Sequence, residues 1–263
     1  MLRALYTAAT GMNAQEKNID VISNNLANIN TTGFKKSRAD FQDLVYQYIV
    51  EPGAQTTANT ANPTGIQIGL GVETVAVQKI FTQGDLTNTG RDLDIAIEGE
   101  GMIAVTHPSG NGLAYTRAGS LRVDQNGQLI TPEGFELDGL APIPTEALSV
   151  NISQDGIISA LVSGSTTPTQ VGTIQGYRFP NKGGLRAIGM NLFEETEASG
   201  TPASGTFGAD GFGRISQGFL ESSNVSVVEQ VVNMITAQRA YEASSKGVQS
   251  ADDMLNQAIN LKR

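Results

Sequence analysis

The sequence predicts an α+β protein, in which helices at the two ends of the chain form a coiled-coil domain and a mostly antiparallel β domain lies between them. Two observations carry this prediction. Apolar residues recur every seven positions near both termini, as they do on helices that pair with other helices. The middle of the 263-residue chain is divided by Gly, Pro and Asn into short apolar runs, as in a sheet of short strands.

The first helix is expected from residue 2 to about residue 29. Its apolar stripe repeats every seven residues and consists of Leu5, Met12, Ile19 and Leu26. An apolar stripe on a polar helix gains most of its stability by packing against a partner. The N-terminal helix is therefore expected to need another helix beside it.

The second helix is expected over residues 225–261. It keeps one seven-residue register through Val227, Met234, Tyr241, Val248 and Leu255. The oxygen-bearing side chains at 222–224 precede it and are expected to cap its N-terminus. We expect the two ends to pair with each other and with neighbouring chains. Two separate surface helices on a globular core are the alternative.

Between the helices, turn residues separate apolar runs and predict three hairpins, with turns at 109–112, 124–127 and 155–156. Further short strands are expected at 94–97, 171–174 and 177–179. The expected division is a discontinuous helical assembly domain at 1–35 plus 222–263, a connector region at 36–92 plus 198–221, and a central β domain at 93–197. Within the connector region, the Gly-, Ser- and Thr-rich stretches 51–69 and 198–213 are expected to be mobile in a monomer.

The composition excludes several functions. The chain has no Cys and one His, which rules out disulfides, a thiolate nucleophile and a multi-histidine metal site. Its net charge of −9 argues against binding to a nucleic acid backbone. No apolar run approaches the 18 residues of a membrane span, so a membrane-embedded protein is not expected. The acidic charge lies in the middle of the chain, since residues 46–219 hold 8 basic and 17 acidic side chains.

Two loops resemble ligand-binding motifs without the surroundings these need. The run at 99–104 matches a dinucleotide-binding glycine pattern, but a strand and a turn follow it, where the motif requires a helix. The run at 124–127 lacks the glycine position and the bidentate Glu of a calcium loop. Neither a nucleotide nor a metal site is predicted, and no cofactor is expected.

The remaining polar candidates are interpreted as surface groups. The carboxylate pairs Asp92 with Asp94 and Glu98 with Glu100 are placed at strand edges in solvent, although paired carboxylates can perform acid–base chemistry. His107 lies beside a proline and is expected in an exposed turn. No catalytic residue is therefore predicted.

One string of residues resembles a known family. Ser23-Asn24-Asn25-Leu26-Ala27-Asn28, followed by Thr32-Gly33-Phe34-Lys35, resembles the N-terminal signature of bacterial flagellar rod and hook proteins. Asn side chains at a helix end can bond free backbone groups, Gly33 permits a sharp exit and Phe34 can anchor the departing chain. Further motifs of this family are resembled in the same order by residues 93–101, by 115–121 with 127–129, and by 218–225 and 234–242, so the resemblance covers essentially the whole chain.

Within the family, the segment at 46–69 resembles an insert of the distal-rod members, and hook proteins usually lack it. We call this segment the insert; its distinguishing residues are Tyr46, Pro52, Gly53 and Pro63. One departure from the family is small, since Met102-Ile103 stands where two aromatic residues are common.

The resemblance implies a non-enzymatic subunit that self-assembles into a helical tube and transmits torque from motor to hook. Terminal helices would form an inner layer around a central export channel, with β domains outside. The implied partners are other copies of the chain, proximal rod proteins, the hook protein, the P-ring and L-ring bushing proteins, and the flagellar type III export apparatus. The implied location is the periplasm-spanning rod, reached without a cleavable signal peptide.

Two other functions stay open at the level of the sequence. Within the family, a proximal rod or hook-type subunit is the alternative. In a different class, a secreted adhesive or carbohydrate-binding β protein is the alternative, and it would need a binding cleft.

Overall fold

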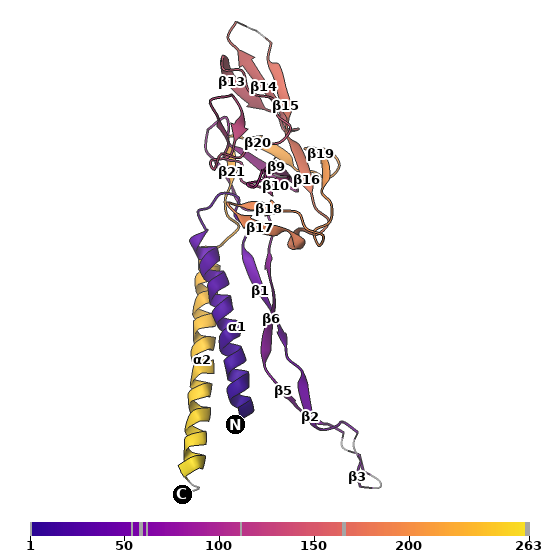
Figure 1. Ribbon diagram of the computed structural model, residues 1–263, viewed down its shortest axis with the longest axis vertical. Coiled ribbons are helices and arrows are strands. Elements are labelled where there is room, and N and C mark those ends of the chain that lie inside the picture. The colour runs from indigo at the N-terminus through magenta and orange to yellow at the C-terminus, as the bar shows by residue number, and fades with distance from the viewer. Residues whose placement is uncertain are drawn as a thin grey trace. The chain divides into compact units, whose positions relative to one another are not determined.

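The computed structural model describes residues 2–53, 55–57, 60–61, 63–110, 112–164 and 167–260 (Figure 1). The predicted α+β fold is confirmed, with terminal helices packed together and a central antiparallel β region. The described residues form two compact units. The helical unit consists of the described residues within Met1–Leu26, Ser37–Gln78 and Ser226–Arg263. The β unit consists of those within Ala27–Lys36 and Lys79–Val225.

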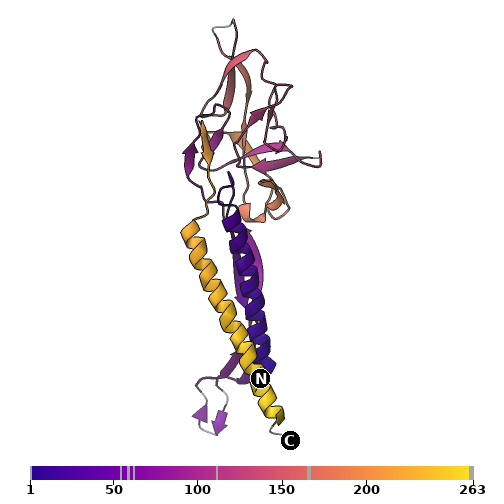
Figure 2. The same ribbon diagram turned by 90° about the vertical axis from the view of Figure 1, so that its left-hand side faces the viewer.

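The two terminal helices lie side by side and antiparallel in both views (Figures 1 and 2). Helix α1 spans Leu2–Ala27 and helix α2 spans Val227–Asn260; the last expected position of the second helix, residue 261, lies outside the described residues. Small residues allow the close approach: a Cβ on Gly11 would lie 3.3 Å from Ser244 Oγ, and one on Gly247 would lie 3.8 Å from Ala8 Cβ.

The side chains expected to cap α2 serve other purposes. Asn224 and Ser222 form hydrogen bonds with residues of the β unit, and Ser223 Oγ is buried without a hydrogen-bond partner. The helix begins three residues later than Asn224, and Gln230 N donates to the Ser226 carbonyl in its first turn. The predicted caps were therefore wrong, because Asn224 and Ser222 are held by earlier residues of the β unit, Lys36, Ile80 and Thr87.

Six strands complete the helical unit. They are β1 (Ser37–Asp43), β2 (Tyr46–Val50), β3 (Gln55–Thr57), β4 (Thr60–Ala61), β5 (Ile66–Gly69) and β6 (Val72–Lys79). They pair as β1 with β6, β2 with β5 and β3 with β4, which makes a long two-stranded ribbon. The ribbon packs on α1 at Gly71, where a Cβ would lie only 2.2 Å from Thr10 Oγ1. The stretch 51–69, expected as a mobile connector, thus contains paired strands.

A six-stranded antiparallel sheet is the centre of the β unit. Its order is β17 (Arg186–Gly189), β18 (Leu192–Glu194), β10 (Leu113–Thr116), β9 (Met102–Thr106), β16 (Gln175–Arg178) and β19 (Ala203–Thr206). A second sheet has the order β13 (Ala147–Ile152), β14 (Ile157–Val162) and β15 (Thr169–Thr173). A 3₁₀ turn at Lys182–Gly184 precedes β17.

Three further strand pairs belong to the β unit. They are β7 (Leu86–Asn88) with β21 (Phe219–Glu221), β8 (Ile95–Glu98) with β20 (Arg214–Gln217), and β11 (Arg122–Val123) with β12 (Leu129–Ile130). The hairpins predicted around 109–112, 124–127 and 155–156 are confirmed as β9–β10, β11–β12 and β13–β14.

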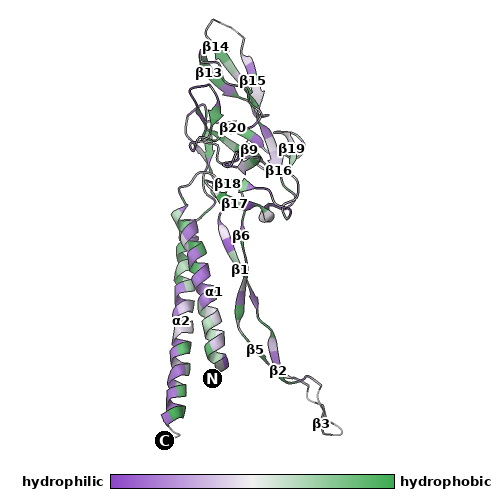
Figure 3. Ribbon diagram, in the orientation of Figure 1, coloured by the Kyte–Doolittle hydropathy of each residue, from purple (hydrophilic) through white to green (hydrophobic). Residues whose placement is uncertain are grey.

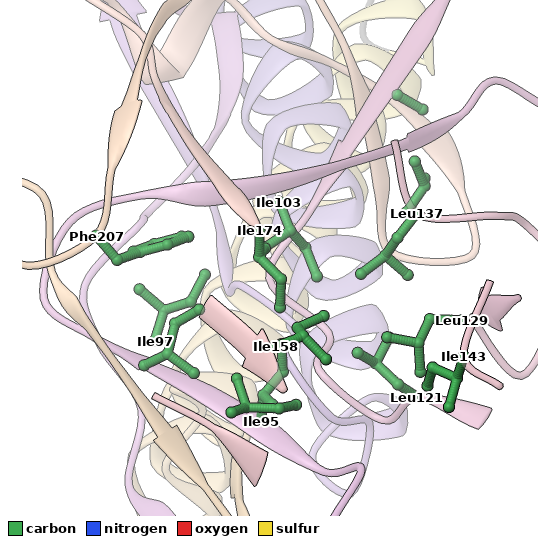
Figure 4. Close-up of a cluster of buried hydrophobic side chains, with 14 of the residues drawn as sticks. Ile95, Ile97, Ile103, Leu121, Leu129, Leu137, Ile143, Ile158, Ile174 and Phe207 are labelled. Carbon is green, nitrogen blue, oxygen red and sulfur yellow. The ribbon is translucent and has the colours of Figure 1, made fainter. Parts of the chain in front are cut away.

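The main core of the β unit is built from aliphatic side chains of many short strands (Figure 4). Ile95, Ile103 and Ile158 lie in it, each at most 1% exposed. Phe207 also belongs to it, and β19 beside it is part of the large sheet. The stretch 198–213, expected as a mobile connector, thus contains a strand of the large sheet. Its many glycines are explained by close contact, since a Cβ on Gly205 would lie 2.5 Å from the Phe212 ring.

Candidate functional site

The family-like string at the end of α1 turns the chain back on itself. Asn25 is buried and its side chain brackets the backbone of Ser37: Asn25 Nδ2 donates to Ser37 O and Ser37 N donates to Asn25 Oδ1, both at 2.8 Å. Asn25 Nδ2 also lies 3.4 Å from Gln230 Oε1 on α2. One amide therefore ties together the end of α1, the start of β1 and the second helix.

Other residues of this string hold the loop after α1. Thr31 N and Thr31 Oγ1 donate to Asn28 O and Asn28 Oδ1, both at 3.2 Å. Ser23 and Ala27 are exposed on the last turns of α1. The string thus contains both buried structural residues and residues open to a partner.

Gly33 and Phe34 lie where the chain returns after α1. Gly33 has a φ of +70°, and a Cβ there would lie 2.8 Å from Ala118 N, so both the backbone angle and the space require glycine. The Phe34 side chain is buried, with Lys79 Nζ 4.6 Å from its ring centroid.

A buried cluster of three charges lies directly after this anchor. Glu221 Oε1 accepts hydrogen bonds from Lys35 Nζ at 2.6 Å and Gly84 N at 2.8 Å, and Glu221 Oε2 accepts one from Arg117 Nε at 2.7 Å. The side chains of Lys35 and Glu221 are 0% exposed and that of Arg117 is 5% exposed. Lys35 Nζ also donates to the Thr82 carbonyl at 2.8 Å. We call Lys35, Arg117 and Glu221 the ion cluster.

Arg117 connects the ion cluster to the glycine-rich loop between β8 and β9. Its Nη2 donates to the carbonyls of Ile97 at 3.0 Å and Gly99 at 2.9 Å, and its Nη1 lies 3.3 Å from the Gly101 carbonyl. The loop that resembles a dinucleotide motif therefore points its carbonyls at a guanidinium of the same chain. The loop joins two strands, as the sequence predicts.

The electrostatics of the ion cluster follow from one carboxylate shared between two cations. Burial alone would raise the pKa of Glu221, but Arg117, the hydrogen bond from Lys35 and the Gly84 amide outweigh it and hold that pKa below its ordinary value. Burial is the main cause that lowers the pKa of Lys35. Glu221 acts in the opposite direction, and the nearby charges of Arg117 and Lys182 add to the lowering. The ion cluster thus favours the charged form of Glu221 and contains two positive charges for one negative charge.

The predicted apolar stripes lie beside the contact between α1 and α2. The buried residues of α2 are Gln230, Ala237 and Ala251, three positions from the predicted register and so about 60° around the helix. Of the predicted stripe residues, Leu5, Met12, Ile19, Leu26, Met234, Val248 and Leu255 are half-buried, and Val227 and Tyr241 are exposed.

A second apolar stripe on α2 was not predicted. Val228, Val232 and Ile235 are 75%, 56% and 53% exposed. At 100° per residue they share one face, opposite to the buried Gln230 and Ala237. Figure 3 shows apolar residues recurring along both helices. We call Val228, Val232 and Ile235 the outward face of α2; it is apolar in these first turns, whereas the same side of the helix carries exposed Arg239, Glu242 and Lys246 further along.

The insert forms the outer part of the ribbon. Tyr46 and Tyr48 lie on one face of the β2–β5 pair, and Ile66 and Ile68 lie on the other, because directly opposed residues share a face. All four side chains are exposed. Pro52, Gly53 and Pro63 are also exposed and lie in the bends beyond these strands.

Two of the polar residues interpreted as surface groups are not fully solvated. Asp94 is buried and accepts a hydrogen bond from Thr89 Oγ1 at 2.7 Å, so its placement at an exposed edge was wrong. His107 is half-buried and its Nδ1 lies 2.6 Å from Ser109 Oγ. Glu98 and Glu100 are exposed, and Glu100 pairs with Lys182. Among the described residues, no group of three or more His, Cys, Asp or Glu side chains could hold a metal ion.

The ion cluster was missed by the sequence analysis. A signal was present, because Lys35, Arg117 and Glu221 each lie inside a different family-like motif of a chain with few charges. A charged residue next to a buried aromatic, such as Lys35 after Phe34, is a candidate for burial with a partner. What the pattern could not supply was which charge meets which.

Three family profiles match the chain and define its class. They are the flagella basal body rod protein over residues 5–35, the flagellar hook protein FlgE/F/G D1 domain over 96–160, and the flagellar basal body rod FlgEFG protein C-terminal region over 216–261. The fold and these matches place the chain among the axial proteins of the bacterial flagellum. No helix in the part of the chain that the structure describes is long and apolar enough to cross a membrane.

Full-length relatives narrow this class. The chain is 48% identical to flagellar basal-body rod protein FlgG of Borreliella burgdorferi, with 100% of both chains covered, and 46% identical to that of Buchnera aphidicola, covering 99% of this chain and all of the relative. It is 39% identical to FlgG of Bacillus subtilis, again over 100% of both. The chain belongs to the FlgG family of distal-rod proteins. It is a structural subunit of the flagellar basal body and is not an enzyme.

Proposed function

We propose that copies of this chain assemble into a rigid helical tube that forms the distal rod, transmits torque to the hook and encloses an export channel. In this tube α1 and α2 of many copies form the inner layer and the β units lie outside. The proposed neighbours are proximal rod proteins, the hook protein, and the P-ring and L-ring proteins. The proposed route is the flagellar type III export apparatus, without a cleaved signal peptide.

The observation that carries this proposal is the apolar outward face of α2. Small residues make the contact between α1 and α2, while Val228, Val232 and Ile235 remain exposed on the opposite side. Burying a valine or isoleucine side chain is worth roughly 1.5–3 kcal/mol. Three such residues on each copy favour contact with helices of other copies, together with the exposed parts of the Leu5–Leu26 and Val227–Leu255 stripes.

The insert supports the same proposal from a second surface. A two-stranded ribbon is marginal in water on its own, and this ribbon has tyrosines on one face and isoleucines on the other. Ile68 and Gly69 border an open groove whose other walls include Ala4 and Ala8 of α1 and Ser244 of α2. Neighbouring copies that cover both faces of the ribbon would resist sliding between subunits and so stiffen the tube.

The test is a charge on the outward face of α2. Val232→Asp in the full chain is expected to abolish filament formation, seen by electron microscopy and sedimentation, while circular dichroism of the monomer stays unchanged. Gln249→Asp, which adds the same charge at an exposed polar position of the same helix, is the control and is expected to assemble. Normal filaments from Val232→Asp would show that this face is not an assembly surface.

A further inference from the structure

The last part of the β unit is a short segment that arrives from far along the chain. We call residues 214–225 the closing segment. Its strand β20 pairs with β8 and its strand β21 pairs with β7, and each pair is a separate two-stranded sheet. The partners of the closing segment therefore precede it by more than a hundred residues.

The closing segment completes the core as well as these sheets. Ile215 is 1% exposed and belongs to the main cluster of buried aliphatic residues. The Gln217 side chain donates to the carbonyls of Asp92 and Val150 at 2.7 and 2.9 Å, and accepts from Ile152 N at 3.1 Å. One side chain thus joins β13 to the chain before β8.

The end of the closing segment also provides hydrogen-bond partners for backbone groups in the N-terminal part of the β unit. Gly33 N donates to the Glu221 carbonyl at 2.8 Å, and Lys36 N donates to Asn224 Oδ1 at 2.7 Å. Asn224 Nδ2 donates to the Ile80 carbonyl at 2.8 Å. Without the closing segment these backbone groups would lose their partners.

The charges make this dependence stronger. Lys35 and Arg117 both precede the closing segment, and Glu221 is the carboxylate that each of them meets in the ion cluster. Before Glu221 is in place, two cations would have to be buried without that negative charge, which is unfavourable in an interior of low dielectric constant. Collapse of the earlier residues into the native β unit is thereby disfavoured.

We propose that the closing segment is a folding gate: the β unit reaches its native state only when residues 214–225 insert and Glu221 binds Lys35 and Arg117. The residues before it form a binding site for an extended segment that carries a carboxylate, and the chain supplies that segment itself. A chain made from its N-terminus onward therefore stays without its native β unit until about 225 residues are available. This inference concerns folding alone and does not depend on the contacts proposed for the rod.

Native-state hydrogen exchange on the full-length monomer tests the gate. If it operates, amides of β20 and β21 exchange through the same opening as amides of β9, β10 and β14, with protection factors that agree within about threefold. A closing segment that opens at least a hundredfold more often, with β9, β10 and β14 still protected, would overturn the proposal. Because this comparison uses the unaltered chain, it does not require any variant to fold.

Variants then test the part of Glu221. Glu221→Gln keeps the shape and removes the charge, and it is expected to raise exchange by at least tenfold across β9, β10, β14, β20 and β21 together. Glu98→Gln on β8, which is exposed, is the matched control and should change these rates less than twofold. Acceleration confined to β7, β8, β20 and β21 would contradict a gate. If Glu221→Gln does not fold, Asn224→Ala is expected to give the same uniform pattern with a smaller increase.

Discussion

At the scale of single residues, Glu221 is the carboxylate that Lys35 and Arg117 share. It is completely buried, and both of these cations precede it in the sequence. Removing one member of such a group leaves uncompensated buried charge and typically costs about 3–5 kcal/mol. Replacing a whole cluster by apolar residues can leave the free energy of unfolding unchanged. The ion cluster is therefore better understood as specifying which segments pair than as a source of net stability.

The lowered pKa of Glu221 predicts a loss of stability in acid. A carboxyl whose pKa is depressed by folding contributes stability above its unfolded value of about 4.3, and that contribution disappears as the pH falls through the lower folded value. Unfolding by urea, followed by circular dichroism at pH 7, 5 and 3.5, should show the wild type losing stability below about pH 5. Glu221→Gln should be less stable at pH 7, and its deficit should shrink at pH 3.5. A deficit that is constant with pH would mean that Glu221 does not titrate as proposed.

Gly33 allows backbone strain and packing to be separated. Gly33 and Gly90 have nearly the same φ, +70° and +67°, but a Cβ on Gly33 would lie 2.8 Å from Ala118 N whereas one on Gly90 would meet nothing within 4 Å. Gly90→Ala should therefore cost only the left-handed backbone, about 1–2 kcal/mol. Gly33→Ala should cost clearly more in the same urea titration. Equal losses would show that the contact with Ala118 relaxes freely.

At the scale of elements, the pairing of α1 with α2 uses small residues and leaves large ones for other contacts. A seven-residue apolar repeat predicts a helix that pairs, and both helices are present. The repeat does not state which face meets the partner within the chain, because Gln230, Ala237, Ser244 and Ala251 also repeat every seven residues without being strongly apolar. Ala237, Ser244 and Ala251 are small, and this size, which permits the approach of Gly11 to Ser244, was the signal for contact with α1.

Among the β elements, too, features set by local sequence were predicted and features set by distant contacts were not. Asp124-Gln125-Asn126-Gly127 predicts its hairpin because the turn geometry is set locally. Residues 203–206 were missed because their Gly and Ser content resembles a linker, and only the position of Phe212 explains it. The ion cluster was missed for a related reason. Its members are 82 and 104 residues apart, and no local pattern encodes contacts at that separation.

At the scale of the whole molecule, a rod subunit must join its copies strongly without binding them before assembly. The helical unit carries the surfaces proposed for assembly, namely the outward face of α2 and the two faces of the insert ribbon. The β unit has its own closed core and ion cluster. If assembly uses these proposed surfaces, it depends on other residues than the folding of the β unit does, so variants in one unit can be tested with the other unit as an internal control.

The insert gives the prediction that belongs to the assembled rod. Deleting residues 51–63 leaves Thr64 and Gly65 between Val50 and Ile66, which is a two-residue hairpin loop, so β2 and β5 can still pair. If the insert stiffens the rod through contacts between copies, filaments of this variant should bend more, with a shorter persistence length in electron micrographs. A second variant, Tyr48→Ser with Ile68→Ser, keeps the length of the ribbon but removes one apolar residue from each face. It should bend in the same direction if these faces make the contacts, and straight filaments from both variants would remove the insert from the mechanism of stiffness.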